Sequence, residues 1–208
     1  LGIPFHFVWR YDCRGRSYSS GYDLNLQSNE YGKALLSLHK KELVTASGLP
    51  NLYIAIANHA GMDHLTWQDR YKWAKATPPD SINWKEPILG RKAVRALKDT
   101  EECKATGYVM SLDATSSGLQ VMAALSGCED TATQVNMVNP DQRVDVYGTI
   151  ANEMSKQLSK PVPRKIIKQA AMTHFYNSRA TPKKLLSAEE LKVFYTVIEG
   201  FLPGADQV

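Results

Sequence analysis

The segment that most constrains this chain is GYVMSLDATSSGLQVMAALS, residues 107–126. Its first half has the bulk of a buried strand, and residues 117–126 have the apolar spacing of a helix. One aspartate, Asp113, lies at the junction and is followed by small residues. A carboxylate at a strand end, beside an unobstructed turn, can bind magnesium. It can equally cap the following helix, although Ser116 or Ser117 could do so instead. The segment alone leaves both roles open.

Composition places the chain among ordinary globular proteins. Its 208 residues are enough to bury a core, with 43% hydrophobic and 22% charged residues. No apolar run is long enough to cross a bilayer, so no membrane partner is expected. Three widely spaced cysteines argue against a disulfide framework or a CxxC zinc site and indicate a reducing compartment. Because the chain begins with Leu1 and shows no signal peptide, we expect it to be a piece of a longer polypeptide.

The net charge of +4 is small, but the cations are concentrated in two windows. Residues 161–186 contain six Lys and Arg residues and no Asp or Glu, and residues 1–18 contain three Arg residues and one Asp. Such windows favour local contact with phosphates over a generally sticky surface. The alternative is a pair of solvated faces that bind nothing, and each window alone supports the two interpretations equally.

Strand-like and helix-like segments alternate along the chain, which predicts an α/β or α+β fold. Helix start signals occur at Thr66, with Asp69 three residues later, and at Ser187, with Glu190 three residues later. Residues 77–105 are polar and contain prolines, so they predict no clear element. The five histidines have no metal-ligand spacing and are expected to be surface residues or hydrogen-bonded core residues.

The segment RKIIKQAAMTHFY, residues 164–176, predicts a helix with a basic face. At about 100° per residue, Lys168, Met172 and Tyr176 lie about 40°, 80° and 120° round the helix from Arg164. Two cations one turn apart can hold a polyphosphate, and an aromatic hydroxyl two turns further along can touch a sugar or base. An amphipathic helix with a solvated basic side also explains this periodicity, and on periodicity alone it is the better interpretation.

Taken together, four segments resemble motifs of the single-subunit RNA polymerases of bacteriophages and mitochondria, in the same order. They are YDCRGRSY (11–18), SLDATSSGLQ (111–120), VDVYG (144–148) and RKIIKQAAMTHFY (164–176). The stretch HAGMDHLTWQDRYKW (59–73) also resembles that family, so the similarity extends over nearly the whole chain. The resemblance implies DNA-directed RNA synthesis with two Mg²⁺ ions, and a DNA template, nascent RNA and nucleoside triphosphates (NTPs) as partners.

The resemblance also implies roles for individual residues. Asp113 matches the aspartate that binds both metal ions, and Ala114 stands where a glycine commonly lends its backbone carbonyl to the metal. Arg164 and Lys168 match the residues that hold the triphosphate, and Lys168 is a candidate to protonate the departing pyrophosphate. Tyr176 matches the tyrosine that closes the nucleotide pocket and helps to select ribose. The expected catalytic residues are therefore Asp113, Lys168 and Tyr176.

Further residues are expected to line the nucleotide and the nucleic acid. Met172 shares the helical face of the triphosphate ligands. Gly118 stands where related DNA polymerases carry a glutamate that crowds the ribose 2′ hydroxyl, so the open space favours RNA as product. An ordinary packing role is an equal alternative for the tyrosine of the VDVYG motif. The residues expected to contact template and hybrid are Arg14, Arg16, Tyr18 and Tyr147.

Two departures from the family pattern matter. Asn177 replaces the glycine that commonly follows the pocket tyrosine, so the hinge there is expected to move differently. The family's second catalytic aspartate lies in a His-Asp-Ser motif, and no His is followed by Asp in this sequence. We therefore expect the chain alone to be inactive, as an excised fragment or as part of a split polymerase. The remaining chain or a second polymerase subunit would supply that aspartate.

The resemblance implies an α+β fragment of a right-hand polymerase fold. Residues 1–140 would form most of the palm, an antiparallel sheet with packed helices and Asp113 at a strand end. Residues 141–208 would begin the helical fingers, with the nucleotide-binding helix at residues 163–178. We expect a host-cell cytoplasmic location, as for a phage enzyme, rather than the mitochondrial matrix. The rival interpretations are a non-catalytic nucleic-acid-binding α/β module and a fragment of a family A DNA polymerase, which would select deoxynucleotides.

Overall fold

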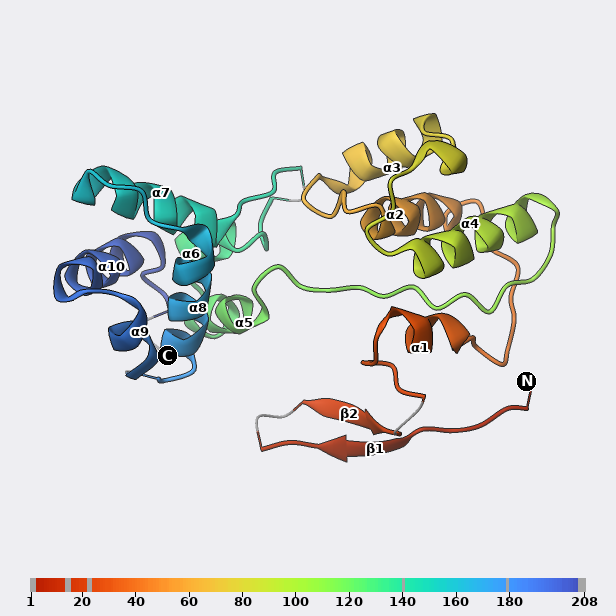
Figure 1. The fold of residues 1–208 in the computed structure, drawn as a ribbon, viewed down its shortest axis with the longest axis horizontal. Helices are drawn as coiled ribbons and strands as arrows, with labels where there is room; N and C mark the ends of the chain where they lie inside the picture. Colours follow the sequence, from red (N-terminus) through yellow and green to blue (C-terminus); the bar gives the residue numbers. More distant parts are fainter. Residues whose placement is uncertain (1–2, 14–15, 22–23, 140, 179, 206–208) are drawn as a thin grey trace. The chain divides into compact units, whose positions relative to one another are not determined.

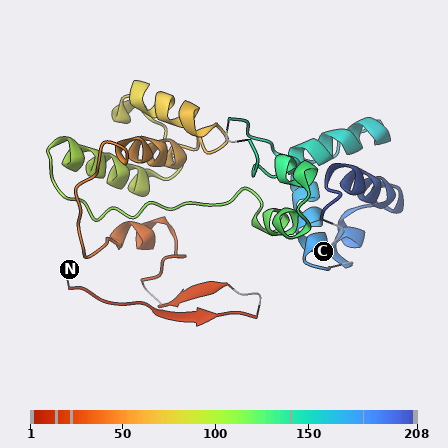
Figure 2. The same ribbon diagram turned by 180° about the vertical axis from the view of Figure 1, so that it is seen from behind.

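Helices make up most of the computed structural model, which describes residues 3–13, 16–21, 24–139, 141–178 and 180–205 (Figures 1 and 2). The strands are Val8–Tyr11 (β1) and Ser17–Ser20 (β2). They are followed by Glu30–Leu35 (α1), Leu49–His59 (α2), Trp67–Ala76 (α3), the 3-10 helix Pro79–Ser81 (η1) and Pro87–Glu101 (α4). The later helices are Ser117–Ser126 (α5), Glu129–Gln134 (α6), Val146–Leu158 (α7), Arg164–Phe175 (α8), Ala180–Leu185 (α9) and Ala188–Phe201 (α10).

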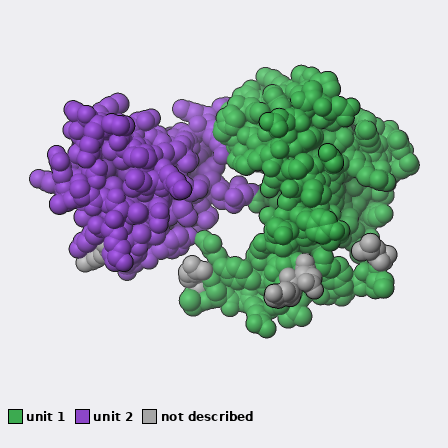
Figure 3. Space-filling view, viewed as in Figure 1, with its two compact units in different colours: residues 1–112 green, residues 113–208 purple. Residues whose placement is uncertain are grey.

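The chain folds as two compact units, residues 1–112 and residues 113–208 (Figure 3). Each unit has its own cluster of buried apolar side chains. The residues expected to bind metal and nucleotide all belong to the second unit, and the described residues of the YDCRGRSY motif belong to the first. The second unit thus contains Asp113, Ala114, Gly118, Tyr147, Arg164, Lys168, Met172 and Tyr176.

In the first unit, α2 packs against α3 and α4, and α1 packs against α4. The core between these helices includes Ile56, Ala57 and Ala93, which are almost fully buried. At the start of α4, the carboxylate of Glu30 accepts a hydrogen bond of 3.0 Å from the amide of Leu89. The first N–H groups of a helix have no partner within it. This contact therefore gives one such amide of α4 a hydrogen-bond acceptor and also attaches α1 to α4.

The strands β1 and β2 form an antiparallel hairpin, with Val8 opposite Ser20 and Tyr11 opposite Ser17. They make up the whole sheet within the described ranges. The prediction of an α+β chain is confirmed to this extent: a mainly helical protein with one small antiparallel sheet. A larger palm sheet is not formed by the residues that the structure describes.

The predicted strand in front of Asp113 is wrong. Residues 107–114 have no regular secondary structure, and Leu112 is 71% exposed. Just before this segment, a single antiparallel bridge joins Thr106 to Glu42. A strand forms only where a neighbour pairs its backbone N–H and C=O groups, and the described part of the chain offers none to residues 108–114. The apolar run therefore stays extended without becoming part of a sheet.

In the second unit, α7 packs against α8 and α10, and α8 also contacts α5 and α9. The largest fully buried side chains at the centre of this unit are Phe194, Ile150, Met154 and Ile167. Burial of each such side chain stabilises the fold by about 1.5–3 kcal/mol relative to exposure. This core fixes α5 and α8, which carry the expected nucleotide-binding residues.

The two helix start signals read from the sequence are confirmed. The Thr66 hydroxyl accepts a hydrogen bond of 3.2 Å from the amide of Asp69 at the start of α3. A reciprocal capping box starts α10: the Ser187 amide donates to the Glu190 carboxylate at 2.7 Å, and the Glu190 amide donates to the Ser187 hydroxyl at 3.3 Å. Both caps satisfy backbone groups that the helix itself leaves unpaired.

One long helix lies where the sequence predicted no clear element. Within residues 77–105, α4 buries Gly90, Ala93 and Leu97, which recur every three to four residues. Small residues and charged neighbours hide this stripe in the sequence. Gly90 is needed because a Cβ atom there would collide with the indole ring of Trp84. The helix end that carries Gly90 is thereby fixed against Trp84.

An exposed apolar pair lies on α5. Val121 is 57% exposed and Leu125, one helical turn later, is 69% exposed. Neither side chain belongs to the core of the second unit.

No helix in the described ranges has both the length and the apolar character needed to cross a bilayer.

Candidate functional site

The helix α8 presents the four predicted residues on its solvent face. Arg164 and Lys168 are exposed, Met172 is 41% exposed and Tyr176, which caps the helix, is 51% exposed. The opposite face is buried and apolar. An ordinary amphipathic helix would show the same division, so exposure alone does not separate the two interpretations of this helix.

Tyr176 at the end of α8 also lies close to α5. A Cβ atom on Gly118 would lie 3.5 Å from the hydroxyl oxygen of Tyr176 and 3.7 Å from its Cζ atom. The two residues are 58 positions apart, yet the packing of α5 on α8 brings them into contact. The phenol is therefore held over a residue that has no side chain. Both residues were predicted to surround the ribose of a nucleotide.

The end of α8 explains how asparagine replaces glycine after Tyr176. Asn177 has φ 63°, the left-handed conformation that ends many helices. Its amide donates to the carbonyl of His174 at 2.8 Å, and the amide of Ser178 donates to the carbonyl of Thr173 at 2.9 Å. This is the Schellman arrangement, and asparagine tolerates it better than other residues with a side chain. The helix consequently covers residues 164–175 rather than the predicted 163–178.

An ion pair that the sequence did not predict occupies the start of α8. The Nε and Nη2 atoms of Arg164 donate to the two carboxylate oxygens of Asp145 at 2.5 and 2.7 Å. This hydrogen-bonded pair lowers the pKa of Asp145 and raises the pKa of Arg164, so the two shifts agree in direction. Asp145 is the residue before α7, and the nearby amides of Tyr147 and Gly148 lower its pKa further. Its place directly before an apolar helix was the available sequence signal.

Tyr147 packs in the core and also touches the basic end of α8. Its side chain is 6% exposed, and the guanidinium carbon of Arg164 lies 5.9 Å from the ring centroid, a cation–π distance. Burial is the main reason why the pKa of Tyr147 is raised, and the nearby Tyr176 hydroxyl raises it further. Tyr147 thus has the packing role considered as an alternative, and it lies next to two predicted nucleotide-binding residues.

Asp113 and Ala114 are the expected magnesium ligands. Both are exposed and lie in the segment without regular structure before α5. A carboxylate and a carbonyl are oxygen donors of the kind magnesium prefers, usually completed by water and substrate phosphates. Within the described ranges, however, no cluster of three acidic, histidine or cysteine residues could hold a metal ion. The donor set therefore fits magnesium in kind but is incomplete in number.

The predicted nucleic-acid contacts at the start of the chain lie in the first unit. Arg14 lies outside the described residues. Arg16 is exposed, and its amide donates to the carboxylate of Asp12 at 3.0 Å. The Tyr18 hydroxyl donates to the other oxygen of the same carboxylate at 3.2 Å. Asp12 therefore organises the hairpin from which these two side chains project.

The histidines behave as expected from their spacing. His59 is buried, with Nδ1 2.8 Å from the Glu86 carboxylate and Nε2 3.1 Å from the Tyr108 hydroxyl. Since a carboxylate only accepts, Nδ1 donates to it, and in the neutral imidazole Nε2 then accepts from the tyrosine. His174 packs among the rings of Phe175, Phe194 and Tyr195, on another side of α8 from Lys168.

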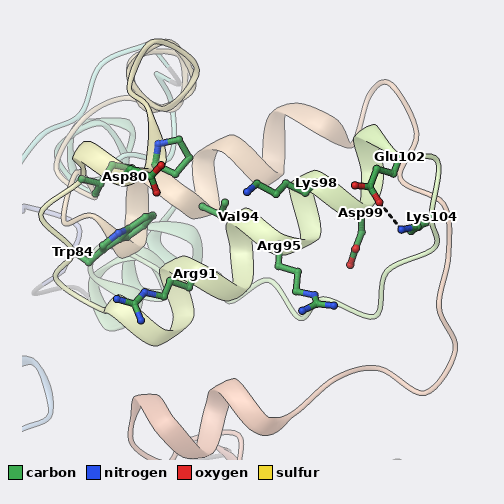
Figure 4. Close-up of a pocket in the computed structure, with 11 residues that line it drawn as sticks. Asp80, Trp84, Arg91, Val94, Arg95, Lys98, Asp99, Glu102 and Lys104 are labelled. Atoms are coloured by element: carbon green, nitrogen blue, oxygen red, sulfur yellow. Dashed lines mark hydrogen bonds and ion pairs between the residues drawn. The ribbon is translucent and has the colours of Figure 1, made fainter.

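A pocket of about 690 Å³ lies in the first unit, along one side of α4 (Figure 4). Trp84 lies toward one end, and an ion pair between Lys104 and Glu102 lies at the other. Cations and carboxylates nearly balance around it, so it lacks the charge excess that favours a phosphate. None of the predicted site residues lines it. Its charged lining residues are Asp80, Arg91, Arg95, Lys98, Asp99, Glu102 and Lys104.

Comparison with known proteins decides the family. The family described as DNA-dependent RNA polymerase matches residues 91–195, half of the chain. The chain belongs to the DNA-dependent RNA polymerase family. The matched residues include α5, α7 and α8, and with them the contact between Gly118 and Tyr176 and the pair between Arg164 and Asp145. The resemblance to single-subunit polymerases is thereby confirmed.

Individual relatives of this polymerase chain come from mitochondria and a phage. The mitochondrial DNA-directed RNA polymerase of Neurospora crassa is 30% identical, over 83% of this chain and 14% of the relative. The DNA-directed RNA polymerase of Pseudomonas phage phiKMV is 28% identical, over 76% of this chain and 22% of the relative. The mitochondrial DNA-directed RNA polymerase 1B of Nicotiana tabacum is 26% identical, over 83% of this chain and 21% of the relative. The chain thus spans less than a quarter of the length of these relatives.

Proposed function

We propose that the protein is part of a DNA-directed RNA polymerase and that this chain forms the pocket for the incoming nucleoside triphosphate. One observation carries the proposal. Tyr176 lies against Gly118, at one end of the exposed face of α8 that also bears Arg164 and Lys168. The two cations that we propose to bind phosphate, and the tyrosine that we propose to face the sugar, thus belong to one helix and its C-cap, within a chain of the polymerase family. Rigid placement of this kind favours reaction by reducing the entropy lost on reaching the transition state.

Each residue of the pocket has a proposed task. Arg164 and Lys168 neutralise and orient the triphosphate, with Met172 beside them on the same face. Lys168 also donates a proton to the pyrophosphate oxygen as the bond to the α-phosphorus breaks. Tyr176 closes the pocket at the sugar, and the absence of a side chain at Gly118 leaves room for a 2′ hydroxyl. RNA is therefore the proposed product.

Asp113 and the carbonyl of Ala114 would hold magnesium in the complete enzyme. Bound there, the metal would neutralise charge on the reacting phosphates. The second carboxylate is proposed to come from outside this chain, either from the rest of a longer polypeptide or from a second polymerase subunit. On this proposal the chain by itself does not polymerise nucleotides.

The proposed macromolecular partners are a DNA template and the growing RNA. Arg14, Arg16 and Tyr18 are the proposed contacts at the start of the chain, and Tyr147 lies beside the nucleotide. By the resemblance, we assign residues 1–140 to the palm and residues 141–208 to the start of the fingers. We further propose that the polymerase acts in the cytoplasm of an infected host cell.

The decisive experiment compares the complete polymerase with its Asp113→Asn variant in primer extension on a DNA template, with magnesium and ribonucleotides. Extension should fall by about a hundredfold or more, while binding to the template is retained. Asp130→Asn is the matched control because Asp130 is an exposed carboxylate of the same unit, on α6.

Each rival function predicts a different result. Unchanged extension by Asp113→Asn would remove Asp113 from the chemistry. Binding of nucleic acid that needs neither magnesium nor nucleotide, without any extension by the unmodified protein, would support the non-catalytic binding module. Preferential incorporation of deoxynucleotides would instead identify a DNA polymerase.

A further inference from the structure

The pair between Arg164 and Asp145 has a geometry that bears on nucleotide binding. The carboxylate contacts the guanidinium from the side, through Nε and Nη2. A guanidinium carries five N–H donors in one plane. The contact with Asp145 uses one hydrogen on each of two nitrogens. The outer edge, made of Nη1 and the second hydrogen of Nη2, has no partner among the described residues. That edge can bind two phosphate oxygens at once.

The surroundings of Asp145 favour its charged form and leave room for its carboxylate. Asp145 precedes α7, whose positive end stabilises the negative charge of the carboxylate. The backbone amides of Tyr147 and Gly148, in the first turn of α7, contribute to this effect. Gly148 leaves space for the carboxylate, because a Cβ atom there would lie 2.6 Å from Oδ2 of Asp145. A larger residue at this position would push the carboxylate away from Arg164. The sequence around Asp145 thus leaves room for a charged carboxylate beside Arg164.

The guanidinium is also fixed from another direction. Its central carbon lies 5.9 Å from the centroid of the buried Tyr147 ring. A planar cation that is hydrogen-bonded along one edge and lies over an aromatic ring has little freedom to rotate. Lys168, one turn further along α8, is exposed and has no hydrogen bond or ion pair to a described residue. Of the two cations, Arg164 is therefore the one whose orientation the protein determines in advance.

We propose that Asp145 is a positioning residue for the nucleotide: it holds the Arg164 guanidinium side-on and thereby presents its outer edge to the phosphates of an incoming NTP. This inference rests on the proposed function and adds to it a residue that touches no substrate. Because the side-on contact leaves the outer edge unoccupied, Asp145 and the phosphates do not compete. Loss of the carboxylate should consequently weaken nucleotide binding.

The alternative is that Asp145 acts as a competitor which the triphosphate must displace. That arrangement requires the carboxylate to occupy the outer edge of the guanidinium, through Nη1 and Nη2. The observed donors are Nε and Nη2, so the geometry favours positioning. The two roles give opposite signs for the change in nucleotide KM when the carboxylate is removed.

The test measures kcat and nucleotide KM for the complete polymerase and for its Asp145→Asn, Arg164→Ala and double variants. Asp145→Asn should raise KM by about threefold, as expected for one partly exposed charge pair, with little change in kcat. In the Arg164→Ala background the same substitution should have no further effect, because Asp145 acts through Arg164. Glu153→Gln, which removes a carboxylate paired with Lys156 at 3.4 Å on α7, should leave both constants unchanged. Thermal midpoints within about 2 °C of each other would show that all variants fold alike.

The outcomes separate this inference from the proposed function. The positioning role would be overturned if Asp145→Asn lowered the nucleotide KM or left it unchanged, or if it raised KM equally in the Arg164→Ala background. If Arg164→Ala still raised KM in that case, the proposed function would stand without the positioning role. Absence of extension by the unmodified polymerase would overturn the proposed function itself. A threefold rise that disappears without Arg164 would support both.

Discussion

The hydroxyl of Tyr176 lies against Gly118, 3.5 Å from the position that a Cβ atom would occupy. This separation is ordinary van der Waals contact, so a methyl group fits there, whereas a longer side chain that points toward the tyrosine would collide with it. Space on this side of the tyrosine therefore depends on the glycine. The contact makes Gly118 the position at which the size of the proposed pocket can be changed most directly.

Enlarging residue 118 should close the pocket in steps. Gly118→Ala should change the kcat/KM for ribonucleotides only slightly, whereas Gly118→Glu should lower it by about tenfold or more. The glutamate should reduce incorporation of ribonucleotides more than that of deoxynucleotides, because the 2′ hydroxyl needs the space. The measurement is single-nucleotide extension with each nucleotide type. Gly200→Ala on α10 is the matched control, since nothing lies within 4 Å of a Cβ atom there. Equal losses for both nucleotide types would contradict a role in sugar selection.

Lys168 is expected to act on the chemical step more than on binding. Lys168→Met keeps an unbranched side chain only one atom shorter and removes its proton and charge, so the extension rate at saturating nucleotide should fall by about a hundredfold. The nucleotide dissociation constant should change much less. Single-turnover extension across a range of nucleotide concentrations separates the two quantities. Lys192→Met provides the control, because Lys192 is an exposed lysine of the same unit on another helix, α10. A weaker affinity with an unchanged rate would remove the proton-donor role.

The buried contact between Tyr108 and His59 should make stability depend on alkaline pH. Burial, with a smaller contribution from the Glu86 carboxylate, raises the pKa of Tyr108 to about 12 from an ordinary value of 10.0. The folded state therefore holds this proton more tightly than the unfolded state, and the resulting stability is fully present below pH 10.0 and is lost as the pH rises toward 12. Tyr108→Phe should cost about 1 kcal/mol of unfolding free energy near neutral pH, because Nε2 of His59 loses its 3.1 Å partner.

Denaturant unfolding between pH 7 and pH 11 would test this. The difference in unfolding free energy between the unmodified protein and Tyr108→Phe should shrink as the pH rises, because only the former has the protected proton of Tyr108. Tyr31→Phe is the control, since Tyr31 is 62% exposed. A difference that stays constant across this range would show that the hydroxyl titrates alike in the folded and unfolded states.

Local signals in the sequence were sufficient to predict much of the secondary structure of the second unit. The helix at residues 117–126 and the capping box at Ser187 depend on residues within a few positions of each other, and both are present. The division of α8 into an exposed and a buried face could be predicted from helical periodicity in the same way. Asn177 could also be anticipated as a helix end, because few residues with a side chain tolerate the left-handed conformation.

Features that depend on distant partners could not be predicted in this way. The strand expected before Asp113 needs a neighbouring strand, and hydrophobicity alone does not say whether one is present. Asp145 was part of a recognised motif, but its partner Arg164 is 19 residues away and on another helix. The helix α4 was missed because its buried stripe consists largely of glycine and alanine, whose burial depends on what packs against them.

The exposed pair Val121 and Leu125 has a practical consequence for handling the protein. Two large apolar side chains one turn apart on α5 cost little in the fold itself, but they offer other molecules a place to adhere. Preparations of this chain should therefore self-associate at high concentration. Replacing Val121 and Leu125 with Lys or Glu should keep them dispersed without disturbing the buried core of the second unit.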